Sequence, residues 1–271
     1  MDAEAYYISQ LKSPYIGDDG AVVGDFIYSM DSFCENIHFK REWMSLEQIA
    51  AKAMLVNISD AIAMNAKPLY ALISISLPHF IEKGHIDELI RGFQNVAHHY
   101  GCEIIGGDTI GGEKLDITIT IISKSDNPLY RTGLKAGDIL AYTGVLGGSK
   151  RDLNALFEGK NVAPTSRFIA PILREDFIYR SREYLRVGMD ISDGLFCDTN
   201  KLLEANNLGC ELIEAIDETL SSSGEEYEML IGFDPQHLAT IQALAGELPI
   251  TPFAKVTPHP TPPFPCQSHH F

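Results

Sequence analysis

Six short segments of the sequence place aspartates close to glycine or serine, directly after an apolar run. The aspartates are Asp18, Asp19, Asp31, Asp60, Asp108, Asp190 and Asp193. Two unit charges about 4 Å apart repel by about 4 kcal/mol at an effective dielectric constant of about 20, so several ionised aspartates in one cleft require cations. Oxygen ligands suit hard ions such as Mg²⁺ or Ca²⁺. The pattern predicts a site for hard metal ions wherever the fold gathers these side chains.

Familiar motifs for calcium or phosphate binding do not account for the aspartates. The sequence has no Asp-x-Asp-x-Asp-Gly loop, which excludes an EF-hand. The glycine-rich stretch at 147–150 lacks the spacing of a P-loop, and protein-kinase signatures are absent. A bound nucleotide is therefore expected to be held by metal ions and glycine-rich turns.

Composition narrows the possible partners. The chain carries 37 acidic and 21 basic residues, a net charge of −16, which repels nucleic-acid backbones. No apolar run reaches the ~18 residues of a membrane span, and no basic-then-apolar leader begins the chain. Five scattered cysteines without a Cys-x-x-Cys pair favour reduced thiols over a disulfide framework or a zinc site. We expect a cytoplasmic protein with neither nucleic acid nor membrane as a partner.

The first half of the chain predicts a ββαβαββ order. Gly24-Asp25 separates two strands of a hairpin, and Ser45 to Gln48 form a capping box that opens a helix. Asn57 and Asp60 share one face of that helix. Further strands are expected at 69–77, 102–105 and 115–123, with a helix at 86–100. The strand at 102–105 ends at Ile105, so that Gly106 and Gly107 turn the backbone and place Asp108 at the mouth of the sheet.

The second half predicts a smaller α/β unit. Residues 125–128 are a linker, which divides the chain into an α+β sandwich domain at 1–127 and an α/β domain at 128–271. The expected strands are 138–143, 187–189, 210–213 and 250–256, the last at a sheet edge because it contains Pro252. The expected helices are 149–158, 167–186, a helix after Gly194 that runs to about Asn207, and 235–245.

Eight motifs in one order resemble the thiamine-monophosphate kinase family, within the aminoimidazole-ribonucleotide-synthetase-like superfamily. They cover nearly the whole chain. They are Gly17-Asp18-Asp19, Ser29-Met30-Asp31 with His38-Phe39, Lys52-Ala53 to Met64, Gly106-Gly107-Asp108-Thr109, Arg131-Thr132-Gly133, Thr143-Gly144, Met189 to Leu195, and Gly224 to Glu228.

The resemblance implies a fold, a reaction and a set of roles. The fold is the α+β sandwich followed by a shortened α/β domain, and homodimers form through the N-terminal sheets. Several Mg²⁺ ions are held by Asp19, Ser29, the carbonyl of Met30, Asp31, Asp60, Asp108, Asp190 and Asp193. ATP lies against Gly107, Asp108, Arg131 and Ser192, and thiamine monophosphate contacts His38 and Glu225. Asp31, Asp60, Asp108 and Arg131 carry catalysis, a direct in-line transfer of the γ-phosphate without a phosphoenzyme.

Several of these residues have a simpler explanation. Asp18 and Asp25 fit turns, Asp193 fits a helix N-cap, and His38 and Arg131 alone would be structural or linker residues. The chain also departs from the family pattern. Glu226 replaces an aspartate, Met30 a threonine and Asn65 a glycine. The C-terminal half is short, and Phe264 is a guess for the aromatic residue on the thiamine ring.

Two other functions remain open. One is a related ATP-dependent enzyme that acts on a purine precursor or on selenide. His38, the Glu225 motif and the lack of an N-terminal cysteine loop count against it. The other is a non-catalytic sensor of nucleotides or thiamine phosphates, against which the full set of metal-type aspartates and Arg131 counts.

Overall fold

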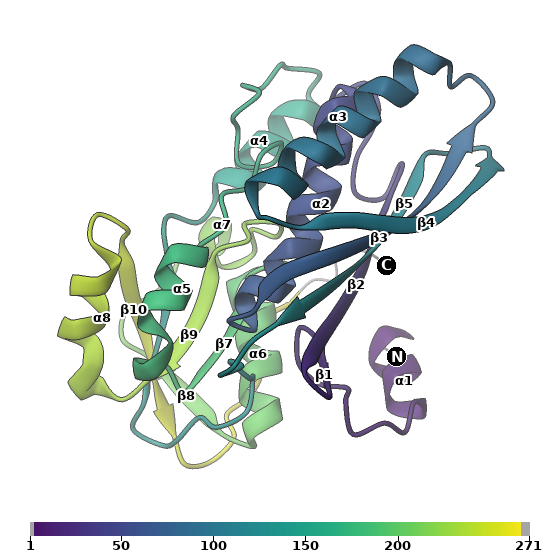
Figure 1. Ribbon diagram of the computed structural model, residues 1–271. Coiled ribbons are helices and arrows are strands. Elements are labelled where there is room, and N and C mark those ends of the chain that lie inside the picture. The colour runs from purple at the N-terminus through teal and green to yellow at the C-terminus, as the bar shows by residue number, and fades with distance from the viewer. Residues whose placement is uncertain (1–2, 267–271) are drawn as a thin grey trace.

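The computed structural model describes residues 3–266, which form two five-stranded sheets with a long helix between them (Figure 1). No helix in this part of the chain has the length and apolarity needed to cross a membrane.

The N-terminal sheet has the order β1-β2-β5-β3-β4. Its strands are β1 (Ala21–Val23), β2 (Phe26–Cys34), β3 (Lys67–Pro78), β4 (Glu103–Gly112) and β5 (Asp116–Lys124). All neighbours are antiparallel except β3 and β4, which are joined by a helix and run parallel. The predicted ββαβαββ order and the mostly antiparallel sheet are confirmed, as is the hairpin at Gly24.

Two helices that run in the same direction cover one face of this sheet (Figure 1): α2 (Leu46–Ala63) and α3 (Lys83–His99). The predicted capping box opens α2, since the Ser45 side chain accepts from the Gln48 N–H and Gln48 reaches back to Ser45. Asn65 follows α2 with φ +54°, the left-handed conformation expected of a glycine substitute. A short helix, α1 (Ala3–Gln10), precedes the sheet.

The C-terminal sheet has the order β7-β9-β6-β10-β8, and all of its pairs are antiparallel. Its strands are β6 (Ile139–Thr143), β7 (Val187–Asp190), β8 (Gly209–Leu212), β9 (Met229–Phe233) and β10 (Ile250–Thr257). The helices are α4 (Gly148–Phe157), α5 (Glu175–Ser181), α6 (Leu195–Asn206), α7 (Glu218–Ser221) and α8 (Leu238–Ala245), with 3₁₀ turns η1 (Arg182–Tyr184) and η2 (Pro235–His237). The domain boundary predicted at 127/128 falls between β5 and β6 and stays a prediction.

Four expectations about elements were wrong. The helix expected at 167–186 begins only at Glu175.

Strand β9 was missed. All five of its residues are buried because the sheet is covered on both faces, which removes the alternation that marks a strand. Pro252 does not mark an edge, because β10 lies between β6 and β8. A register shift at Pro252 accommodates the proline, and pairing with β8 starts only at Ala254.

The fourth wrong expectation concerns the glycine turn before Asp108. Strand β4 does not end at Ile105 but continues to Gly112, with Gly106 and Gly107 inside it. Its register against β3 shifts by one residue at Ile105, between the pairs formed by Ala71 and Leu72. Gly107 has φ +149°, and a Cβ there would lie 1.7 Å from the carbonyl oxygen of Ile73. The glycine therefore permits close strand pairing.

One apolar core joins the two sheets. The largest cluster of buried side chains includes Ile58 of α2, Ile119 of β5 and Ile231 of β9. A second cluster packs α6 against the opposite face of the C-terminal sheet, through Leu202 and Leu230. Because α2 packs against both sheets, it fixes the position of one relative to the other.

Candidate active site

A cavity of about 830 Å³ lies where the two sheets meet. Ten of the residues predicted to form the site line it: Asp19, Met30, Asp31, His38, Asp60, Arg131, Asp190, Ser192, Asp193 and Glu225. They come from the loop before β1, from β2, from α2 and from the C-terminal half, so the cavity exists only because the chain halves pack together.

A carboxylate cluster forms the acidic part of the cavity. One oxygen each of Asp19, Asp60 and Asp190 lie within 4.8 Å of one another. Burial, and then the charges of neighbouring aspartates, raises the pKa of Asp60 and of Asp190 well above the ordinary value. The backbone N–H of Asp31 donates to Asn57 Oδ1 (2.8 Å), which fixes β2 against α2 and brings this fourth aspartate to the same wall.

The donors in this cluster fit a hard divalent cation. The Oδ2 atom of Asp19 and the Oγ atom of Ser29 are buried and accept no hydrogen bond from any described residue. Buried oxygens without partners are rare in proteins and require an explanation. The three converging carboxylates offer oxygen ligands alone, as Mg²⁺ prefers. Asp19, Asp60 and Asp190 are the residues that could hold such an ion.

Arg131 supplies positive charge beside the cluster. Its guanidinium forms an ion pair with Asp19, and its backbone N–H donates to Asp18 Oδ1 (2.6 Å). Burial alone would lower the pKa of Arg131, but Asp19 raises it above the ordinary value, so the side chain stays charged. Asp18 thus holds Arg131 in place, and the pKa of Asp18 is raised mainly by burial.

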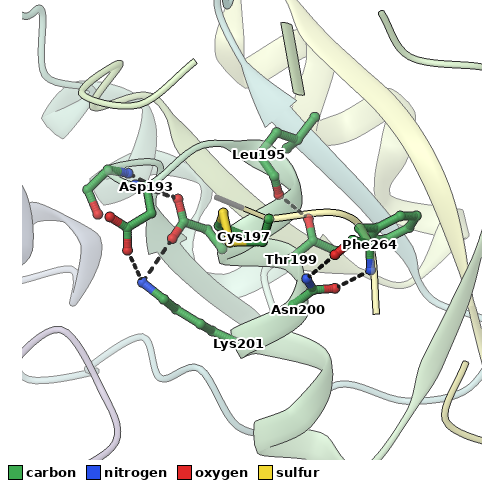
Figure 2. The surroundings of a disulfide bond; sticks show 10 residues. Asp193, Leu195, Cys197, Thr199, Asn200, Lys201 and Phe264 are labelled. Atoms are coloured by element: carbon green, nitrogen blue, oxygen red, sulfur yellow. Dashed lines mark hydrogen bonds and ion pairs between the residues drawn. A yellow bond between two sulfur atoms is a disulfide. The ribbon is translucent and has the colours of Figure 1, made fainter. Parts of the chain in front are cut away.

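The turn between β7 and α6 is organised by a residue that the sequence analysis missed. The carboxylate of Asp198, which is fully buried, accepts the N–H groups of Ser192 and Asp193, both at 3.1 Å. Burial raises the pKa of Asp198 to about 7. Lys201 pairs with both Asp193 and Asp198 (Figure 2). The alternative explanation of Asp193 as a helix N-cap is wrong, because Gly194 occupies that position.

The two similar segments Asn57-Ile58-Ser59-Asp60 and Asp190-Ile191-Ser192-Asp193 meet in space. The Ser59 hydroxyl donates to Asp190 Oδ2 (2.6 Å), and both groups are buried. This bond partly opposes the rise in the pKa of Asp190 that burial causes. It ties α2 to β7 at the centre of the carboxylate cluster.

The expectation of five reduced thiols was wrong for two cysteines. Cys197 in α6 and Cys266 form a disulfide (Figure 2), whereas Cys34, Cys102 and Cys210 are free. The bond ties the segment after β10 to the first turn of α6. In the same segment Phe264 stacks on Phe196 with ring centroids 4.3 Å apart, and it does not line the cavity. The cysteine argument for a reducing compartment therefore fails.

His38 and Glu225 also line the cavity. The Nδ1 atom of His38 accepts the backbone N–H of Cys34 (3.0 Å), which puts the proton of a neutral ring on Nε2. Glu225 has φ +54°, a strained conformation for a residue with a side chain. Its N–H donates to the Ser192 carbonyl (2.7 Å). Glu226, which stands where the family has aspartate, accepts from the N–H groups that begin α4.

Three predicted site residues lie outside the cavity lining. Ser29 is buried on the face of β2 that meets α2, the same face as Asp31. Asp108 is paired with Ser74, which is paired in turn with Thr118 and then Ser32 across the sheet. Three strand spacings of about 4.8 Å separate Asp108 from Ser32 by about 14 Å. Gly107, beside Asp108 on β4, is equally distant.

Besides Asp198, sequence reasoning missed several residues at the cavity. Lys201, Glu204 and Tyr227 line it. Lys201 follows Asp198 by one helical turn, a spacing that could have predicted the ion pair. Glu204 and Tyr227 gave no such signal.

Comparison with known proteins agrees with this architecture. Residues 17–124 match the family described as AIR synthase related protein, N-terminal domain. The chain is 32% identical to the thiamine-monophosphate kinase of Aquifex aeolicus over 213 residues, which is 75% of this chain and 69% of the relative. It is 30% identical to that of Rhodopirellula baltica over 275 residues, 89% of this chain and 82% of the relative.

A solved structure described as AaThiL complexed with AMPPCP and TMP superposes with a TM-score of 0.84 at 26% identity. The superposition covers 94% of this chain and 89% of that one. With the fold, the order of the motifs and the extent of these matches in agreement, the chain belongs to the thiamine-monophosphate kinase family, in the AIR-synthase-like superfamily.

Proposed function

We propose that the protein transfers the γ-phosphate of ATP to the phosphate of thiamine monophosphate, which gives thiamine diphosphate and ADP. The observation that carries the proposal is the cluster of Asp19, Asp60 and Asp190 beside Arg131, in a cavity that also contains His38 and Glu225. Two anionic phosphates can approach each other only where cations and oriented donors offset their charge. Membership of the family supports the choice of acceptor.

Mg²⁺, held by Asp19, Asp60 and Asp190 with Asp31 and Asp193 beside them, would neutralise the phosphate oxygens and align the two substrates. Met30 and Ser29 also belong to the proposed ligand set. The full ligand set expected for the metal also includes Asp108, which one chain does not bring to the cavity. A role for Asp108 and Gly107 at the phosphates therefore requires a second copy of the chain.

The chain's own residues have separable tasks in this proposal. The charge on Arg131 offsets charge on the phosphoryl group in transit, and Asp18 keeps its backbone in place. Ser192, fixed by Asp198, offers its side chain to the nucleotide. His38 and Glu225, which line the same cavity, orient the thiamine end.

The transfer is direct. The bond between the γ-phosphorus and the β–γ bridging oxygen breaks, and its electron pair leaves with ADP. An oxygen of the acceptor phosphate forms the new bond to the same phosphorus. That oxygen is already anionic at neutral pH, so no general base is required, and inversion at phosphorus is expected.

The test measures ADP formation with purified protein, ATP and Mg²⁺. Thiamine monophosphate, purine-precursor phosphates and selenide are each supplied in turn as the acceptor. Turnover that requires thiamine monophosphate and stops with EDTA supports the proposal. Turnover with another acceptor would replace it by the related-enzyme alternative. Tight binding of thiamine monophosphate without turnover would replace it by a sensor.

We also propose that two copies pair through the face of the N-terminal sheet that α2 and α3 leave uncovered, and that the enzyme works in the cytoplasm. Residues that point to this open face include Tyr28, Tyr70 and Leu72, which are 38%, 39% and 37% exposed. Apolar faces of this kind often mark interaction surfaces.

A further inference from the structure

Lys52 is a lysine whose side chain is entirely buried. It belongs to α2 and has no exposed side-chain surface. Burial lowers its pKa, whereas the charge of Glu225 opposes that change. Its Nζ atom donates to Glu225 Oε2 at 2.7 Å. An isolated buried ammonium is unfavourable, and the carboxylate of Glu225 offsets the charge of Lys52.

The ammonium group lies at the junction of the two chain halves. Its Nζ atom is 3.6 Å from the ring centroid of Phe168, which precedes α5, and 5.6 Å from that of Phe33 in β2. A desolvated cation over an aromatic ring is attracted by the negative face of the ring. Two rings and one carboxylate therefore fix the position of the charge, and Lys52 does not line the cavity.

Glu225, in contrast, does line the cavity. Lys52 holds its Oε2 atom, and no hydrogen bond from a described residue reaches Oε1. The backbone of Glu225 is in the left-handed conformation, and the hydrogen bond from Lys52 fixes the direction of its carboxylate. Phe33, which borders the ammonium, also stacks on His38 with centroids 5.5 Å apart. Lys52 thus contacts Glu225 directly and His38 through the ring of Phe33, and these are the two residues that we assign to the thiamine end.

We propose that Lys52 is a positioning residue for the acceptor substrate. It fixes the carboxylate of Glu225 so that Oε1 meets a hydrogen-bond donor or cationic group of the thiamine moiety. The proposal rests on the proposed function. Because Lys52 does not line the cavity and bonds Glu225, we expect its effect on the acceptor and not on ATP.

The experiment measures KM for each substrate in Lys52→Met, Lys52→Arg and Glu225→Gln. We expect Lys52→Met to raise KM for thiamine monophosphate about tenfold or more, the usual cost of losing a charged hydrogen bond, and to leave KM for ATP within about twofold. Lys52→Arg keeps the charge and should recover part of the loss. The matched control is Lys67→Met, because Lys67 also contacts a ring of the other chain half, Tyr179, and does not line the cavity.

The double variant Lys52→Met/Glu225→Gln shows whether the lysine acts through the glutamate. Its KM for thiamine monophosphate should equal that of Glu225→Gln alone. Additive effects, or equal losses for ATP and acceptor, would overturn the proposal. The double variant removes both charges and leaves no unpaired buried charge, so it should fold even if Lys52→Met does not. Its comparison with Glu225→Gln then still tests the proposal. No wild-type turnover of thiamine monophosphate would overturn the proposed function, whereas wild-type turnover with unchanged KM in Lys52→Met overturns only the role of Lys52.

Discussion

The ionised side chain of Asp60 is unfavourable for folding but is required for the proposed function. Burial, and then Asp31 and Asp190, raises its pKa well above the ordinary value, so its ionised form is unfavourable in the folded protein. The same carboxylate is a proposed metal ligand. Groups of this kind reduce stability where they support activity.

We therefore expect Asp60→Asn to stabilise the metal-free protein and to abolish turnover. In EDTA the free energy of unfolding should rise by about 1 kcal/mol, the scale of single stabilising changes, because repulsion within the cluster is relieved. Urea unfolding and the ADP assay measure the two effects. Asp126→Asn is the control, because Asp126 is exposed in the loop before Pro128. A less stable Asp60→Asn protein would show that the cluster does not strain the fold.

At the scale of elements, β4 owes its position to a glycine. A Cβ on Gly107 would lie 1.7 Å from the Ile73 carbonyl oxygen, whereas a Cβ on Gly111 of the same strand meets nothing within 4 Å. Alanine at Gly111 therefore measures the effect of replacing a glycine in β4, and alanine at Gly107 adds the effect of the clash with β3.

Gly107→Ala should lower the free energy of unfolding by about 2 kcal/mol or more, and Gly111→Ala should change it by less than about 0.5 kcal/mol. Urea denaturation of both variants measures this difference. Equal stability would mean that β3 and β4 are not paired in this register.

The segment after β10 is tied to α6 by the Cys197–Cys266 disulfide and by two hydrogen bonds between the Asn200 side chain and the backbone of Phe264, both 2.9 Å (Figure 2). The disulfide closes a loop with a sequence separation of 69. In the chain-entropy account, closure of such a loop destabilises the unfolded state by about 4 kcal/mol.

Thiol counting tests this pairing. In denaturant without reductant, three of the five cysteines should react, namely Cys34, Cys102 and Cys210. Five should react after reduction. Cys266→Ser should expose the Cys197 thiol and lower the free energy of unfolding. Five reactive thiols before reduction would show that the two cysteines are not joined.

At the scale of the whole molecule, the open face of the N-terminal sheet decides between a monomer and a dimer. Leu72 lies on this face and Leu212 lies on β8 of the other sheet, and each is 37% exposed. The two leucines form a matched pair for a charge substitution.

We expect the wild-type protein to be a dimer in size-exclusion chromatography with light scattering at micromolar concentration. Leu72→Lys should shift it towards monomer, because a buried unpaired charge opposes association, whereas Leu212→Lys should not. A monomeric wild type, or a dimer that only Leu212→Lys disrupts, would rule out pairing through the open face.

The sequence alone located most of the predicted residues that line the cavity. Residue type and local spacing singled out the aspartates, and the family resemblance added the other candidates. Ten of the predicted residues line one cavity. The capping box of α2 and the left-handed Asn65 depend on neighbours within a few residues, so local rules predicted them. Strand β9 escaped because burial on both faces erased its pattern.

Only the tertiary structure decided which side chains meet. Lys52 and Glu225 are 173 residues apart, and Ser59 and Asp190 are 131 apart, so no local pattern couples them. The same holds for Asp198 beneath the Ser192 turn and for the bond between Cys197 and Cys266. Pairing of β3 with β4 likewise placed Asp108 on the edge strand of the sheet, a position that the residues around the aspartate do not encode.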